Sequence, residues 1–135
     1  MKTIDTDKHS LLDMARLIDD WKQKYHVNNR HEIIFQNKAL FSNVRFPSNF
    51  LHAGHVNSRG FENIPECISA PDEVWSYWLN PDKKKQFDAC RNYIIFSSEI
   101  NYCVTTEAGV IKKAEVVVPS KIDSFRKGLI IYRGK

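Results

Sequence analysis

Apolar residues near the start of the chain recur at intervals of three and four. They fall on one face of a helix between residues 8 and 25, and that face carries Leu11, Met14, Ala15, Ile18, Trp21 and Tyr25. Thr6 or Ser10 can cap the start of such a helix, and Asn28-Asn29 can end it. The pattern predicts an N-terminal helix within residues 1–30 whose aromatic stripe packs against the core.

In the middle of the chain, the spacing of the apolar residues changes several times. Residues 32–36 and 39–41 fit short strands or irregular buried chain, and residues 45–50 read as a loop. Apolar residues between 61 and 69 have helical spacing, although Pro65 weakens that helix unless it lies in the first turn. Pro71 is followed by Val74, Trp75 and Trp78, which fit one helix face, so we expect a short helix within residues 71–79.

From Arg91 onward the chain is rich in β-branched and aromatic residues, which predicts strands over residues 92–97, 101–106, 111–118 and 129–133. Ala108-Gly109 is a bend, Pro119 closes the third strand, and a polar connection follows it. These connections are too short for parallel crossovers. The order predicts one α+β domain over residues 1–135, with N-terminal helices packed on a curved, mainly antiparallel sheet of four to five strands.

Composition narrows the class of protein. The chain has 135 residues, no apolar run of about 18 residues that could span a membrane, and no apolar signal-peptide core at its start. Its three cysteines are an odd number without a CxxC pair, which favours reduced thiols and a cytoplasmic site of action. We therefore expect an ordinary soluble domain with no membrane partner.

Positive charge is concentrated at the C-terminal end. The formal net charge is +4, and from Val110 onward seven basic residues stand against two acidic ones. This asymmetry favours a polyanionic partner, and we assign Lys121, Arg126 and Lys127 to contact with an RNA backbone. The alternative is an exposed basic loop without a ligand.

Titratable groups and glycines are most crowded in residues 51–60. His55 can take or give a proton near neutral pH, and Arg59, four positions later, can hold a phosphate. His52 is the second candidate for proton transfer. His52, His55, Cys67 and Cys90 match no familiar zinc spacing, and glycine-rich nucleotide loops are absent, so we expect no metal and no cofactor.

Several short motifs occur together in this chain: His-x-x-x-Arg, Ile-Pro-Glu-x-Ile, Pro-Asp-Glu-Val-Trp, the strand Arg91-Asn92-Tyr93-Ile94, a valine-rich strand and a final Arg-Lys-Gly-Leu-Ile-Ile-Tyr. From about Leu51 to Arg133 the sequence resembles the barnase–EndoU–colicin E/D–RelE-like nuclease domains of phage head-associated proteins and bacterial polymorphic toxins. The resemblance implies a nuclease-like core over residues 51–133 and a metal-independent endoribonuclease, with tRNA among its substrates. It also implies a cognate immunity or antitoxin protein, and delivery within a larger secreted or phage protein.

The residues that match the site of these nucleases are His55, Arg59, Ser120 and Tyr132. A second histidine and lysine pair of the EndoU type is missing, so that detailed mechanism does not transfer. RNA cleavage without a metal needs a proton acceptor for the 2′-hydroxyl, stabilised phosphate charge and a proton for the leaving oxygen. We assign proton transfer to His55, phosphate contact to Arg59 and Ser120, and phosphate contact or base stacking to Tyr132 and Tyr93. Two alternatives stay open: a non-catalytic nucleic-acid-binding module, and a structural phage or interaction domain.

Overall fold

A computed structural model of the chain describes residues 11–50, 58–80, 82 and 89–134. Its helices are α1 (Leu11–Lys24), α2 (Ser58–Phe61), α3 (Ile64–Ser69) and the 3-10 helix η3 (Pro119–Phe125). Its strands are β1 (His26–Val27), β2 (Ile33–Asn37), β3 (Ser42–Phe46), β4 (Glu73–Trp78), β5 (Ala89–Ile95), β6 (Asn101–Glu107), β7 (Val110–Val117) and β8 (Leu129–Arg133). None of the described helices is long and apolar enough to cross a membrane.

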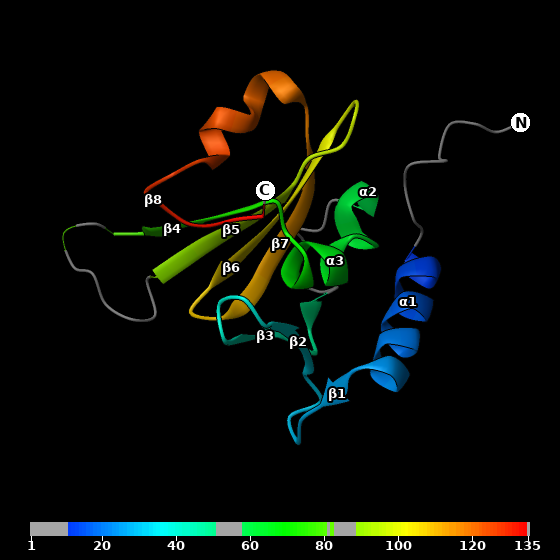
Figure 1. Cartoon of the computed structure of the whole chain (residues 1–135). Coiled ribbons are helices and arrows are strands. Elements are labelled where there is room, and N and C mark those ends of the chain that lie inside the picture. The colour runs from blue at the N-terminus through cyan, green and yellow to red at the C-terminus, as the bar shows by residue number, and fades with distance from the viewer. Residues whose placement is uncertain (1–10, 51–57, 81, 83–88, 135) are drawn as a thin grey trace, which may run out of the picture.

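The strands form one twisted sheet in the order β1-β2-β3-β7-β6-β5-β4-β8 (Figure 1). Neighbouring strands are antiparallel except β3 and β7, which run parallel and meet where Arg45 pairs with Val110. The α+β class and the mainly antiparallel sheet are therefore as expected. The sheet has eight strands rather than four to five, because the segments after α1 and after α3 also join it.

The helix expected within residues 71–79 is wrong, since this segment is strand β4. Its residues alternate between the two sides of the sheet, and Val, Trp and Tyr have high strand propensity. Six residues are also too few for a stable isolated helix. As a strand, β4 pairs with β5 on one side and with β8 on the other. The last strand therefore joins the sheet through β4, which among the described strands is the one that it pairs with.

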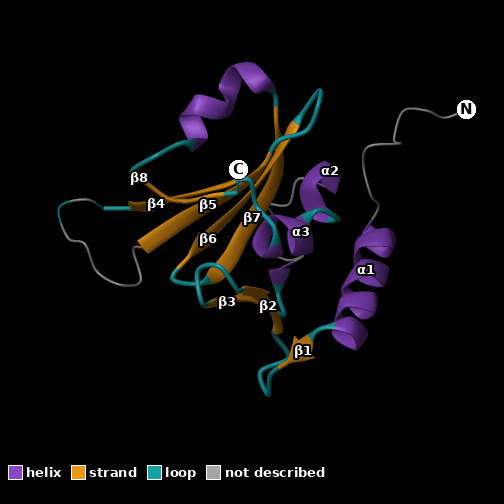
Figure 2. Ribbon diagram, viewed as in Figure 1, coloured by secondary structure: helices purple, strands orange, loops and turns teal. Residues whose placement is uncertain are grey.

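The three α-helices cover one face of the sheet (Figure 2). The helix predicted near the N-terminus is confirmed as α1, and its Trp21 ring stacks on Phe61 and meets Phe35 and Phe46 edge-on. Pro65 lies in the first turn of α3, where its missing N–H costs nothing. A Cβ on Gly60 would lie 2.9 Å from the backbone nitrogen of Glu115, so only glycine lets α2 approach β7 this closely. The larger core lies on this helix-covered face.

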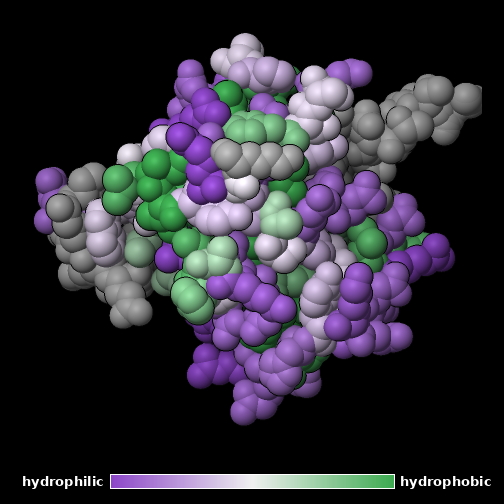
Figure 3. All heavy atoms as spheres, viewed as in Figure 1, coloured by the Kyte–Doolittle hydropathy of each residue, from purple (hydrophilic) through white to green (hydrophobic). Residues whose placement is uncertain are grey.

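The opposite face carries a smaller apolar cluster. Ile94, Cys103 and Val117 form it, and Trp75, Ile122 and Phe125 pack against it. Among the described elements, η3 is the one that packs here, and it is the orange coil on the far side of the sheet from α1 in Figure 1. Hydrophobic atoms also gather at the surface where β4 ends and β8 begins, whereas hydrophilic residues cover the side of α1 and β1 (Figure 3). The sheet thus has one fully covered face and one partly covered face.

Candidate nucleic-acid interface

The partly covered face, called the open face below, combines polar, charged and aromatic side chains. Alternation along β4, β5, β6 and β7 directs to this face Glu73, Trp75, Tyr77, Asn92, Ile94, Cys103, Thr105, Lys113 and Glu115. The last residues of η3 and the two that follow it lie over the same face. An apolar layer would be enough to support a 3-10 helix, so the polar groups at the centre of this face mark it as the candidate site.

Glu73 is the centre of the first polar network on this face. Its Oε1 accepts hydrogen bonds from Trp75 Nε1 at 2.9 Å and from Arg126 Nε at 2.9 Å, and Arg126 Nη2 donates to Oε2 at 3.2 Å. Glu73 is buried although it is charged. The hydrogen bond with Glu73 raises the pKa of Arg126, which remains a cation. The pair fixes the end of η3 to β4 and neutralises the carboxylate where it is buried.

Arg126 makes two further contacts. Nη1 donates to Asp123 Oδ1 at 3.2 Å, and the guanidinium lies 5.2 Å from the centre of the Phe96 ring. Two carboxylates and an aromatic ring therefore already surround this cation. The RNA contact assigned to Arg126 from the sequence would have to share a side chain that holds η3 in place.

Asn92 is the centre of a second network. Its Oδ1 accepts from Tyr77 Oη at 3.2 Å and from Thr105 Oγ1 at 2.9 Å, while Nδ2 donates to the carbonyl oxygen of Phe125 at 2.9 Å. Burial raises the pKa of Tyr77 to about 12, so its phenol remains a donor at neutral pH. The network ties β4, β5, β6 and η3 together and fixes the orientation of the Tyr77 ring.

Two lysines near this face differ in how they are held. Lys127 is exposed, and its Nζ lies 5.4 Å from the centre of the Tyr77 ring. Lys113 Nζ lies 3.2 Å from Glu115 Oε2, but the contact is not aligned as a hydrogen bond, and that buried oxygen has no other partner among the described residues. Lys127 is therefore a cation on this face that a phosphate can reach without breaking an ion pair of the described chain.

The structure brings four of the predicted site residues to the η3 side of the sheet. Ser120 and Lys121 are exposed on η3, and Arg126 and Lys127 follow its last turn. The polar connection expected here is thus a 3-10 helix with its basic residues gathered at one end of the open face. This arrangement fits the backbone contact assigned to these residues.

The two predicted tyrosines lie on the helix-covered face instead. Tyr93 is 1% exposed inside the main core, and its hydroxyl contacts Arg91 Nη1 at 3.3 Å. No base can stack on a ring buried in this way in this conformation, whereas the phosphate contact assigned to the Tyr93 hydroxyl stays a prediction. Tyr132 pairs with Val74 across β4 and β8 and packs, half-buried, against the same core. It therefore does not share a surface with Ser120.

The remaining two predicted residues are only partly described. His55, like His52, lies outside the described residues. Arg59 is in α2, on the helix-covered face beside β7, and its side chain lies outside the description. The meeting of His55 and Arg59 at one phosphate stays a prediction.

Sequence reasoning missed the residues that organise the open face. Glu73, Trp75 and Tyr77 alternate along β4, and this period of two was the available signal. It was hidden because Val74, Trp75 and Trp78 also fit one side of a helix. Asn92 and Thr105 gave a weaker signal, as polar residues within otherwise apolar strands.

The cysteines considered as metal ligands are buried. Burial raises the pKa of Cys67 well above its ordinary value, which disfavours the thiolate that a metal requires. Among the described residues, no group of three or more His, Cys, Asp and Glu side chains is placed to hold a metal ion.

Comparison with known proteins adds no relative. No protein-family model matches the chain, and no match was found among curated proteins or solved structures. The likeness to the nuclease domains named above rests on short motifs alone.

Proposed function

We propose that the chain is a metal-independent endoribonuclease that binds single-stranded RNA across the open face. The observation that carries this proposal is the pairing of Tyr77 with the exposed Lys127, whose Nζ lies 5.4 Å from the ring centre. Proteins that bind single strands combine aromatic rings, on which bases stack, with cations that follow the phosphates. Stacking on such a ring contributes about 1–3 kcal/mol per base.

Further groups on the same side support a path for the strand. The exposed Phe96 lies beneath Arg126, and the indole of Trp75 is held by Glu73. Exposed Lys121 and Ser120 extend the basic and hydroxyl groups along η3. We propose that Lys127 and Lys121 contact successive phosphates and that Tyr77 receives a base.

Cleavage would follow from attack of the 2′-hydroxyl on the adjacent phosphate. His55 is the proposed proton-transfer residue, and Arg59 is the proposed phosphate holder. Ser120 would donate a hydrogen bond to phosphate from η3. Arg59 and Tyr132 remain in the proposed set only through the sequence and its resemblance, because α2, which carries Arg59, and Tyr132 both lie on the helix-covered face. The effector role in the cytoplasm, the tRNA substrate and the cognate immunity or antitoxin protein are proposals on the same basis.

An RNA-cleavage assay in excess chelator tests the catalytic half. The wild-type chain should yield products with 2′,3′-cyclic phosphate ends, and His55→Ala should lose cleavage by about 10²-fold or more while the Tm and RNA affinity stay the same. His31→Asn is the matched control, because His31 is an exposed loop histidine with a positive φ that asparagine tolerates. Full activity of His55→Ala would remove His55 from the mechanism and point to His52.

RNA affinity measured against salt concentration tests the binding half. Lys127→Ala should weaken binding and reduce the slope of log affinity against log salt by about one, whereas Lys22→Ala on α1 should change neither. Salt-sensitive binding without cleavage would select the non-catalytic nucleic-acid-binding module. Neither binding nor cleavage would leave the structural phage or interaction domain.

A further inference from the structure

The sheet has β1 and β2 at one edge and β8 at the other. At the first edge, the short β1 leaves part of β2 without a neighbouring strand. Strand β1 is two residues long and pairs only with Ile33 and Ile34, whereas β2 continues to Asn37. The carbonyl oxygen of Glu32 accepts a hydrogen bond from the backbone N–H of Asn28, so it points toward β1. Backbone groups of alternate residues in a strand point to the same side, so those of Gln36, four residues later, point to this side as well. The N–H and C=O of Gln36 therefore face outward, where the described chain offers no strand to pair with them.

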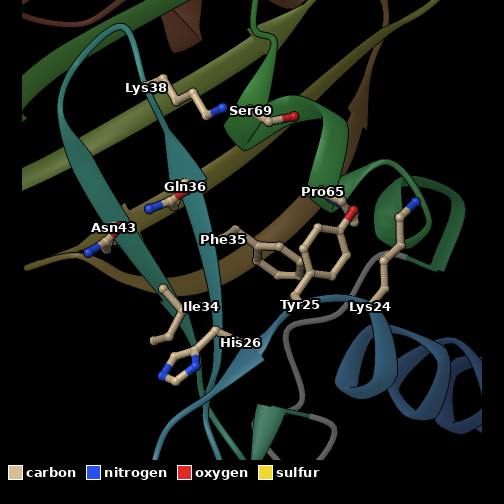
Figure 4. Close-up of a pocket in the computed structure, with 10 residues that line it drawn as sticks. All are labelled: Lys24, Tyr25, His26, Ile34, Phe35, Gln36, Lys38, Asn43, Pro65 and Ser69. Atoms are coloured by element: carbon tan, nitrogen blue, oxygen red, sulfur yellow. The ribbon is translucent and has the colours of Figure 1, made fainter.

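A groove of about 510 Å³ lies directly beside this edge (Figure 4). We call it the edge groove. Its walls come from the end of α1 and the start of β1, from β2 and the residue after it, from β3 and from α3. The residues that matter here are Lys24, Tyr25, His26, Gln36, Lys38 and Pro65. The Tyr25 ring meets Phe35 edge-on with 4.9 Å between ring centres, which gives the groove a fixed apolar floor. The groove thus combines a free backbone edge with a preformed aromatic surface.

The charged groups of the edge groove have one sign. Lys24 and Lys38 line it with His26, and no aspartate or glutamate is among its described lining residues. Lysines beside an open edge discourage pairing with a second copy of the same basic chain. The same lysines attract a strand that carries carboxylates. The positive charge of the groove therefore favours an acidic strand over a second copy of this chain.

We propose that the edge groove binds an extended acidic peptide segment of another protein, which adds as a strand to β2. The incoming backbone pairs with the N–H and C=O of Gln36, its carboxylates face Lys24 and Lys38, and an apolar side chain at an alternate position packs on Tyr25 and Pro65. Strand addition of this kind takes its affinity from main-chain hydrogen bonds and its specificity from side-chain pockets. The site is separate from the open face and does not depend on RNA cleavage.

Fluorescence anisotropy with a labelled peptide of alternating valine and glutamate tests the proposal on the full chain. The peptide should bind more tightly than about 1 mM at low salt. Replacing its glutamates by lysines should abolish binding, and so should placing proline at its centre, because proline has no N–H to donate. In the protein, Lys24→Glu combined with Lys38→Glu should weaken binding about tenfold or more, since two attractions become repulsions.

Lys22→Glu combined with Lys112→Glu is the matched control, because it makes the same change of net charge at exposed positions outside the groove. This control should lose less than about threefold in affinity. Bound peptide should also slow hydrogen exchange at the amide of Gln36. An equal loss in both double variants, undiminished binding of the proline peptide, or an unchanged Gln36 amide would overturn strand addition at β2.

Discussion

At the scale of single residues, Gly128 occupies a position where a residue with a Cβ atom would clash with the neighbouring strand. Its φ is +76°, in the left-handed region that favours glycine. A Cβ at this position would lie 2.2 Å from the carbonyl oxygen of Ser76 and 2.8 Å from Tyr77 Cβ. Any other residue at position 128 would therefore have a strained φ and would also clash with β4. The position lies where the chain enters β8.

Gly128→Ala should lower the free energy of unfolding by about 3 kcal/mol or more, because a left-handed alanine and a backbone clash act together. Gly109→Ala is the matched control: its φ is +80°, but the nearest atom to an added Cβ is 3.9 Å away. That variant should lose only the conformational cost, about 1–2 kcal/mol. Urea unfolding measures both values, and equal losses in the two variants would contradict the clash with β4.

At this scale the sequence indicated exposure where a side chain is charged whatever its surroundings, while the RNA contact of these lysines stays a prediction. Lys121 and Lys127 were chosen for charge alone, and both are exposed near the open face. Tyr93 was chosen as a strand aromatic and is buried. A phenol ring serves equally well in a core or on a surface, so its identity does not decide between them.

At the scale of elements, the attachment of η3 to β4 organises the open face. η3 has no buried residue of its own, and Ile122 and Phe125 are only partly buried. Its ties to the sheet therefore include the Arg126–Glu73 pair and the hydrogen bond from Asn92 to Phe125. Sequence analysis could not find this attachment, because Glu73 and Arg126 are 53 residues apart.

Arg126→Ala should lower the free energy of unfolding by about 2 kcal/mol, because Glu73 would stay buried without its cation. Lys121→Ala, an exposed change in the same helix, should stay within about 0.5 kcal/mol. Arg126→Leu combined with Glu73→Leu should lose less than the sum of the two single changes, since no unpaired charge remains. Additive losses in this cycle would show that the pair does not couple η3 to β4.

At the scale of the whole molecule, buried acids that stay protonated make stability fall at alkaline pH. Burial raises the pKa of the Cys103 thiol from 9.0 to about 12 and that of the Tyr77 phenol from 10.0 to about 12. The unfolded chain loses these protons first as the pH rises, so the folded state binds more protons between pH 9 and 12. Their contribution to stability is fully present below this window and is lost as the pH rises through it.

We therefore expect the urea midpoint to decrease steadily from about pH 9 upward. Tyr77→Phe should make this decrease shallower, because one of the groups that titrates only in the unfolded chain is removed. Tyr102→Phe is the control, since it removes the same hydroxyl from another half-buried strand tyrosine, one that packs against the main core. Identical slopes in the wild-type chain and in Tyr77→Phe would contradict a raised pKa at Tyr77.

The sequence by itself determined the elements whose signal is local. The helix α1, the strands β5, β6 and β7, and the bend at Ala108 and Gly109 were all predicted, because their periodicity or turn chemistry is complete within a few residues. The same locality made the basic residues around η3 visible. Period and charge can be read from neighbours in the chain.

Tertiary structure decided what depends on distant partners. β4 is a strand because β5 and β8 pair with both of its edges, and β3 enters the sheet by a parallel contact with β7. A period of two says that side chains alternate, but not which face the helices cover. The helices cover the face that carries Tyr93 and leave the face that carries Tyr77 open. Burial is set by what packs on a face and not by the strand that carries the residue.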